Sequence, residues 1–200
     1  MKLDPVHDLQ SVFRKIAKAA SFPGEIVDLE PECERLDIGL PVSREIVLIA
    51  LTLLDAETGF CFASGHAGEC ETLVSRMTFA RRREPGQSDF IFLSSDCPFG
   101  GRVLEAARTG TLADPHRGAT VVLELPFITS AVDSREHEVL TLSGPGIRTR
   151  NRIKAGGDLS WVDTRASKNS EYPLGIDMIL IDGHGRLAFI PRTTRIERGG

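Results

Sequence analysis

The most continuously apolar helical segment of the chain runs from Arg44 to Leu54, with hydrophobic side chains on nearly every side of a helix. Thr52 is the only uncharged polar residue within it, and Ser43, directly before it, is of a type that often caps helix N-termini. A helix that is apolar all round is normally buried between other elements. The pattern therefore predicts a central helix over residues 44–54.

A second helix is predicted near the beginning of the chain, where hydrophobic positions recur with a helical period. The stripe consists of Leu9, Val12, Phe13, Ile16, Ala17 and Ala20. Asp8 is a candidate N-cap, and Arg14, Lys15 and Lys18 fall on the opposite face. We interpret that basic face as solvated.

Short apolar runs alternate with helical segments through the first 125 residues. Strands are predicted at residues 24–29, 59–63, 90–94 and 121–125, and another at 139–142. Helices are predicted at 67–81, ending in three arginines that favour the helix dipole, at 102–108, and, with a poor pattern, at 159–166. Such alternation is typical of a single α/β domain, here residues 1–200, with a mixed, mostly parallel sheet flanked by helices.

The C-terminal region predicts a β-hairpin over about residues 176–191. Ile176 to Ile181 and Leu187 to Ile190 are apolar runs, separated by Gly183-His184-Gly185. A two-residue turn would place Asp177 directly opposite Arg192 as an ion pair. A three-residue loop would place Asp177 opposite Pro191 and leave Arg192 free for an anion.

Several polar groups are candidates for ligand binding, although no nucleophile-plus-base set can be assembled and the catalytic residues stay unknown. Charges in an apolar hairpin need a partner, so a structural salt bridge and a ligand site are both open for the first two residues. The candidates are Asp177, Arg192, Thr193 and Thr194, then Thr109, Gly110 and Thr111, and finally Arg148 after the turn Gly144-Pro145-Gly146. The turn from Ser64 to Gly68, between a strand and a helix, is either a weak anion site or an ordinary βα turn.

Composition narrows the function classes. The 24 basic and 28 acidic residues give a net charge of −4, which argues against a nucleic-acid binder. No apolar run approaches the roughly 18 residues of a membrane span and no signal peptide is visible, so a cytoplasmic protein is expected. Cys33, Cys61, Cys70 and Cys97 match no metal or iron–sulfur spacing, so we expect free thiols that are buried or half-buried, and no metal site.

Four groups of residues together resemble the H subunit of the bacterial carbon–phosphorus lyase core complex. They are Phe13-Arg14 with Ser21-Phe22-Pro23-Gly24, Thr109-Gly110-Thr111 with Pro115 and Gly118-Ala119-Thr120, Leu142 to Ile147, and Pro173 to Asp177 with Ile190 to Thr194. These groups occur in order over almost the whole chain.

The resemblance implies a role in phosphonate use, with the G, I and J subunits as partners and K or L as further ones. In that family an early step replaces the adenine of ATP with a phosphonate, giving a ribose 1-phosphonate 5-triphosphate. The I subunit is the expected seat of the nucleosidase chemistry, and a different, radical iron–sulfur subunit cleaves the carbon–phosphorus bond. This chain is then either a contributor to the nucleotide or phosphonate site or a non-catalytic subunit that holds its partners in place.

The resemblance also implies the fold of the large domain of pyridoxal-phosphate-dependent transferases, without that cofactor. The chain has only Lys2, Lys15, Lys18, Lys154 and Lys168 as possible Schiff-base residues, and none follows a strand suitably. We therefore expect no pyridoxal phosphate and no other cofactor in this subunit. We also expect the isolated chain to form a homodimer, because a subunit of an assembly exposes an apolar patch.

Overall fold

The larger of two β-sheets forms the middle layer of the computed structural model, which describes residues 3–39, 42–97, 100–130 and 139–199. Its strands are β1 (Ile26–Asp28), β2 (Gly59–Ala63), β3 (Arg81–Arg82), β4 (Phe90–Leu93), β5 (Thr120–Leu125), β9 (Asp177–Asp182) and β10 (Arg186–Ile190). They lie in the order β1-β10-β9-β5-β4-β2-β3. The pairings β2–β3, β2–β4, β4–β5 and β5–β9 are parallel, and β9–β10 and β1–β10 are antiparallel. The prediction of an α/β fold with a mixed, mostly parallel sheet flanked by helices is confirmed.

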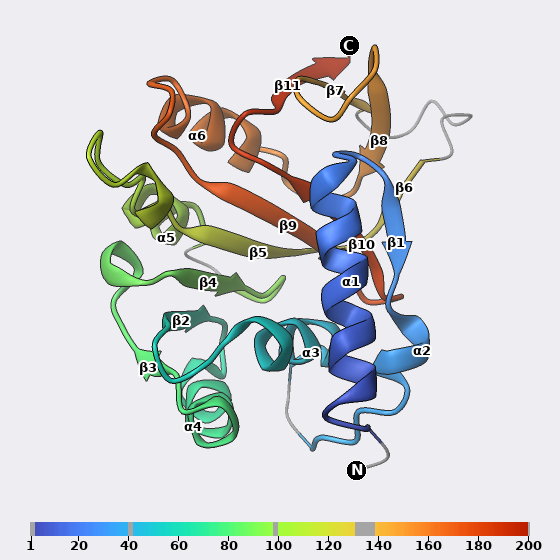
Figure 1. Ribbon diagram of the computed structural model, residues 1–200, viewed down its shortest axis with the longest axis vertical. Coiled ribbons are helices and arrows are strands. Elements are labelled where there is room, and N and C mark those ends of the chain that lie inside the picture. The colour runs from blue at the N-terminus through green and yellow to red at the C-terminus, as the bar shows by residue number, and fades with distance from the viewer. Residues whose placement is uncertain (1–2, 40–41, 98–99, 131–138, 200) are drawn as a thin grey trace.

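Helices α1 (His7–Ser21), α2 (Glu30–Cys33), α3 (Arg44–Leu53) and α4 (Ala67–Thr78) pack on one face of this sheet, with α1 lying across it beside α3 (Figure 1). Helix α3 is central, as predicted, because Ile46 to Ala50 are fully buried. Ser43 caps it, its hydroxyl accepting a hydrogen bond from the Ile46 amide. The short helix α2 falls in a segment whose sequence showed no helical pattern.

The opposite face is covered by α5 (Gly100–Ala106), α6 (Trp161–Lys168) and a second, antiparallel sheet (Figure 1). That sheet has the order β11-β7-β8-β6 and consists of β6 (Ile128–Thr129), β7 (Val139–Ser143), β8 (Asn151–Ala155) and β11 (Arg195–Gly199). Only β7 was predicted. Strand β11 is largely exposed and carries charged residues, and β8 contains Arg152 and the buried Lys154, so neither strand shows a clear apolar pattern.

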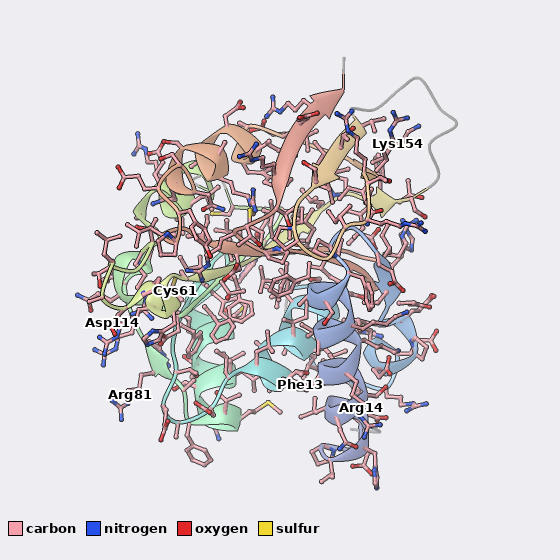
Figure 2. All side chains as sticks on the ribbon, turned by 45° about the horizontal axis from the view of Figure 1, so that its top comes forward. Phe13, Arg14, Cys61, Arg81, Asp114 and Lys154 are labelled. Carbon is pink, nitrogen blue, oxygen red and sulfur yellow. The ribbon has the colours of Figure 1, made fainter. Side chains whose placement is uncertain are left out.

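Helix α4 ends earlier than the sequence predicted. Phe79 adopts a left-handed conformation with φ 63° after Thr78, and the buried Ala80 turns the chain back toward the sheet. Arg81 and Arg82 then form the edge strand β3, and Arg81 projects outward at the edge of the molecule (Figure 2). The interpretation of this arginine triplet as the end of a helix was wrong.

Helix α1 buries a narrower stripe than predicted. Val12, Ile16 and Ala19 face the core, whereas Phe13 is 54% exposed beside Arg14 (Figure 2). The N-cap prediction was also wrong, because Asp8 is the second residue of the helix. The Asp4 carboxylate instead accepts hydrogen bonds from the Val6 and His7 amides just before it.

The C-terminal hairpin pairs β9 with β10 through the three-residue loop Gly183-His184-Gly185, with Ile190 opposite Met178. The buried Asp182 carboxylate holds this loop by accepting hydrogen bonds from the amides of His184 and Arg186. Strand β1 pairs outside β10, and β9 pairs with β5, so the hairpin is inside the sheet. No helix of the described segments is long and apolar enough to span a membrane.

Candidate functional site

Asp177 and Arg192 form an ion pair at the amino end of the parallel strands. Asp177 is the first residue of β9, and Arg192 follows β10 by two residues. The Arg192 Nε atom lies 3.1 Å from Asp177 Oδ2, and the Arg192 amide donates to Asp177 Oδ1 at 2.7 Å. The side chains are only 15% and 19% exposed, so the pair is largely shielded from water.

The ion pair forms even though the hairpin has the three-residue loop, which was expected to leave Arg192 free for an anion. The loop has three residues and Asp177 lies opposite Pro191, as in the second alternative. The pairing of β9 and β10 nevertheless ends at Ile190, and the chain turns, with the Thr194 amide donating to the Pro191 carbonyl. The turn brings the Arg192 side chain back over Asp177, so the expectation of a free Arg192 was wrong.

The rest of the Arg192 guanidinium is also bound within the protein. Its Nη1 atom donates to the Pro115 carbonyl at 2.6 Å. Gly118 lies directly against it, and a Cβ atom there would come 2.5 Å from Nη1 and 2.2 Å from the Gly175 carbonyl oxygen. All three guanidinium nitrogens thus have partners in this chain, and glycine is required at position 118 by close approach.

The structure brings Thr109 and Gly110 close to this pair. Thr109 forms a β-bridge with Gly118, and its carbonyl accepts a hydrogen bond from the Gly175 amide. Gly110 has φ 82° and packs against the Pro115 carbonyl. Thr111 lies in an exposed turn, where its hydroxyl accepts from the Asp114 amide. These residues form a backbone support for the segment that carries Arg192.

Two residues that sequence reasoning missed complete the arrangement. Asn169 accepts a hydrogen bond from the Ile176 amide at 2.8 Å and donates to the Arg192 carbonyl at 3.3 Å. Arg165 is 3% exposed and donates to the Pro191 and Thr194 carbonyls. Burial lowers the pKa of Arg165 to about 10, while the charge of Asp177 acts in the opposite direction. Arg165 lies in α6, and Asn169 directly follows that helix. The helical pattern of α6 is poor in the sequence because one of its buried residues, Arg165, is charged.

We name this arrangement the amino-end cluster, consisting of Pro115, Gly118, Arg165, Asn169, Asp177 and Arg192. A shallow groove passes beside it, lined in part by His116, Tyr172 and Thr193. Thr194 is 2% exposed and lies below the groove rather than in it.

Arg148 lies elsewhere, in the exposed loop between β7 and β8. The glycines of that loop have packing roles. A Cβ atom at Gly146, which has φ 81°, would come 2.7 Å from the Ser21 carbonyl oxygen, and Asn151 donates from Nδ2 to the Pro23 carbonyl at 2.7 Å. Two of the motifs that carry the family resemblance therefore support each other in space.

A cleft of about 290 Å³ lies at the opposite, carboxyl end of strands β4 and β5, where ligands commonly bind in open α/β sheets. We name it the carboxyl-end cleft. Its lining includes Ser94, Ser95, Leu104, Glu124, Asp158 and Trp161. The signal for it in the sequence was Glu124, the one charge in the apolar run from Val121 to Leu125, but it was not recognised.

Glu124 is held in the carboxyl-end cleft by one of its two oxygens. Its Oε2 atom accepts hydrogen bonds from the Ser94 hydroxyl at 2.8 Å and from the Ser95 amide at 2.9 Å. No described residue donates to Oε1. Trp161 is 6% exposed, and its indole Nε1 is buried without an acceptor among the described residues.

The turn from Ser64 to Gly68 joins β2 to α4, as predicted. The Gly65 amide donates to the Asp96 carboxylate at 3.0 Å, so a side chain of the protein already occupies one donor of the turn. This contact favours the ordinary βα turn over an anion site.

The four cysteines are free, with Cys33, Cys61 and Cys70 buried and Cys97 half-buried, which confirms that prediction. Burial raises the pKa of the Cys33 thiol to about 12 and that of Cys61 to about 11, so neither is a ready nucleophile or metal ligand. Among the residues with described positions, no group of His, Cys, Asp and Glu could hold a metal ion.

Comparison with known proteins agrees with the resemblance seen in the sequence. The sequence model of the family described as "Bacterial phosphonate metabolism protein (PhnH)" matches residues 2–197. A putative C-P lyase subunit protein HtxG of Stutzerimonas stutzeri is 32% identical over 193 residues, covering 96% of this chain and 87% of that protein. The alpha-D-ribose 1-methylphosphonate 5-triphosphate synthase subunit PhnH of Rhizobium meliloti (strain 1021) is 26% identical over 199 residues, covering 98% and 93%. The chain therefore belongs to the bacterial phosphonate metabolism protein family PhnH.

Proposed function

We propose that this chain is a subunit of a carbon–phosphorus lyase complex and takes part in forming ribose 1-phosphonate 5-triphosphate from ATP and a phosphonate. The observation that carries the proposal is the family match over residues 2–197, together with the synthase-subunit relative that aligns over nearly the full chain. The partners are the other core subunits, G, I and J. The chain acts in the cytoplasm, without nucleic acid or membrane, and by itself is inactive.

A second candidate is a non-catalytic subunit that only holds its partners in place. The amino-end cluster favours it for the residues first considered as a ligand site, because the guanidinium of Arg192 is fully engaged by Asp177 and Pro115. The carboxyl-end cleft favours a contribution to substrate binding, because Glu124 has one carboxylate oxygen there to which no described residue donates.

Reconstitution of the complex tests both candidates. The G, I and J subunits are combined with and without this chain, assembly is followed by light scattering, and conversion of ATP and phosphonate is followed by phosphorus NMR. Loss of conversion on omission is expected, and full conversion without the chain would contradict the proposed function.

A subunit with Arg192→Ala separates the two candidates further in the same assay, because Arg192 is one of the residues that the sequence predicted to bind a ligand. Intact assembly with lost conversion would reject the pure scaffold. Failed assembly alone would remove support for a ligand site at Arg192, Thr193 and Thr194.

We further propose that this subunit binds no pyridoxal phosphate, although the family resemblance implies the fold of the large domain of transferases that use it. Lys15 pairs with Glu32, Lys18 with Glu25, and Lys168 donates to the Ala107 carbonyl; Lys2 lies outside the described residues. Lys154 is in β8 of the second sheet and is 1% exposed. A bound chromophore absorbing above 400 nm in the purified protein would contradict this.

We also propose that the isolated chain forms a homodimer. Phe13 on α1 is 54% exposed (Figure 2). Phe22, just after the helix, is 52% exposed, and exposed aromatic side chains of this kind suit a partner. Light scattering that shows a strict monomer at high concentration would contradict the proposal.

A further inference from the structure

The lining of the carboxyl-end cleft is acidic and apolar. Glu124 and Asp158 contribute carboxylates, and Leu93, Leu104 and Leu125 contribute apolar surface. No lysine, arginine or histidine is among the described residues that line it. Arg198, which is not among the lining residues, acts on the charge of Asp158, but the lining itself carries only negative charges. A phosphate or phosphonate placed inside would meet these like charges, so the cleft suits an uncharged ligand or part of a ligand.

The free hydrogen-bonding atoms of the cleft define what such a ligand must carry. Glu124 Oε1 is an acceptor without a donor among the described residues, while Oε2 is fixed by Ser94 and Ser95. A carboxylate held in this way is a suitable acceptor for a sugar hydroxyl, and strand-end acidic residues bind ribose hydroxyls in dinucleotide-binding sheets.

Trp161 supplies apolar surface. Its side chain lines the cleft, whereas its indole Nε1 atom is buried from solvent and is therefore out of reach of a ligand in the cleft. With Leu93, Leu104 and Leu125, the Trp161 side chain adds to the apolar part of the lining. A planar heterocyclic ring would pack against this apolar lining.

The size of the cleft limits the ligand as well. Its volume of about 290 Å³ is at the lower end of the range of small-molecule sites, which is about 300–1,000 Å³. The space suits a nucleoside better than a nucleoside triphosphate, whose phosphates would have to extend outside.

We propose that the carboxyl-end cleft binds a nucleoside moiety, with Glu124 accepting from the ribose hydroxyls and the Trp161 side chain and the leucines of the lining packing against the base. The proposal rests on the proposed function, in which the complex uses ATP. It assigns the nucleoside part of that substrate to this subunit and leaves the phosphates and the phosphonate to other surfaces of the assembly.

The chain provides its own probe for this site, because Trp161 is its only tryptophan. Tryptophan fluorescence of the isolated full-length chain is titrated with adenosine, with 2′,3′-dideoxyadenosine and with ATP. A saturable change with adenosine is expected, with at least tenfold weaker binding of the dideoxy compound, which lacks the hydroxyls. ATP is expected to bind no more tightly than adenosine.

A matched pair of variants assigns the effect to Glu124. Glu124→Gln is expected to weaken adenosine binding about tenfold or more, the usual scale for a hydrogen bond to a charged acceptor. Glu71→Gln is the control, because Glu71 also accepts a backbone hydrogen bond, from the Phe62 amide, but does not line this cleft. Circular dichroism checks that both variants are folded. No saturable change with adenosine, equal binding of the dideoxy compound, or equal weakening by both variants would overturn the proposal.

The same variant in the reconstituted complex separates this inference from the proposed function. If adenosine does not bind and the complex with Glu124→Gln still converts ATP and phosphonate at the wild-type rate, the nucleoside site is rejected while the proposed function stands. If conversion proceeds fully without the chain, the proposed function fails, whatever the fluorescence shows.

Discussion

The two ends of the parallel strands hold their polar groups in opposite ways. At the amino end, Arg192 and Asp177 satisfy each other, and Pro115 accepts the remaining guanidinium nitrogen. At the carboxyl end, Glu124 uses one oxygen for Ser94 and Ser95, and no described residue donates to the other. Buried side-chain atoms without a partner among the described residues occur at both ends, Trp161 Nε1 at the carboxyl end and Arg165 Nε and Thr194 Oγ1 near the amino end, so the contrast concerns the charged groups.

The difference shows why a charge in an apolar region does not by itself indicate function. A shielded charge costs free energy unless it is paired, and a pair closed within the protein leaves little capacity for a ligand. Arg192 is paired with Asp177 and also donates to the Pro115 carbonyl, so its main effect is to fasten the end of the hairpin to the loop before β5. Glu124 accepts hydrogen bonds from described residues through only one of its two carboxylate oxygens, so the carboxyl end is the better place for binding a ligand.

The largest effect is expected from Arg192→Ala. It leaves the Asp177 carboxylate, 19% exposed, without its cation and should lower the free energy of unfolding by about 3 kcal/mol. Urea denaturation followed by circular dichroism measures this. Arg148→Ala, in an exposed loop, is the control and should change stability by less than about 0.5 kcal/mol. Equal stability of the two variants would break the comparison, because the amino-end cluster would then not be structural.

Gly118→Ala should have the next largest effect. The new methyl group would lie 2.2 Å from the Gly175 carbonyl oxygen and 2.5 Å from Arg192 Nη1. Either the backbone at Gly175 or the ion pair between Arg192 and Asp177 must therefore shift. We expect a loss of about 2 kcal/mol, in the range for overpacked sites. Gly183→Ala, where a Cβ meets nothing within 4 Å, is the matched glycine control and should lower the midpoint of thermal unfolding much less. A wild-type midpoint for Gly118→Ala would mean that the close approach is not rigid.

Much of the larger sheet could be predicted from the sequence because its strands are buried on both faces. The runs at β2, β4, β5 and β9 are nearly continuous apolar segments, which a parallel sheet between two helical layers requires. Strands β8 and β11 of the second sheet could not be recognised. The exposed positions of β11 carry charges, and the buried part of β8 includes a charged residue, Lys154, between Ile153 and Ala155.

The amino-end cluster could be predicted only in part. The sequence indicated Asp177, Arg192 and the segment around Thr109, but the ion pair depends on a turn after Pro191 that no strand register describes. Asn169, which binds backbone groups of two segments, gave no signal because a single amide in a weak helix has no periodic pattern.

Glu124→Gln should affect stability less than either change at the amino end. The amide oxygen can still accept from the Ser94 hydroxyl and the Ser95 amide, but a neutral acceptor forms weaker bonds, so a loss of about 1 kcal/mol is expected by urea denaturation. A loss as large as that of Arg192→Ala would show that the carboxyl end is fastened as tightly as the amino end, and the contrast between the two ends would disappear.

The smallest effect concerns Glu45, at the start of α3. Burial raises the pKa of its carboxyl group, and the charges of Glu124 and Asp182 at the carboxyl end of the sheet add to the shift. Between its unfolded and its raised folded pKa, the folded state keeps a proton that the unfolded state has lost. Wild type therefore carries a penalty at pH 7 that disappears as the pH falls through the folded pKa.

Glu45→Gln removes this titration, so the stability of wild type relative to the variant should rise as the pH is lowered from 7 to 4. Urea denaturation at a series of pH values measures the difference directly, and other titrating groups cancel because both proteins contain them. The same comparison in a Glu124→Gln background should show a smaller rise, since one of the neighbouring charges is gone. A pH-independent difference would mean that Glu45 does not experience the carboxylates of this edge, and the acidic character assigned to the carboxyl end would then be confined to the cleft itself.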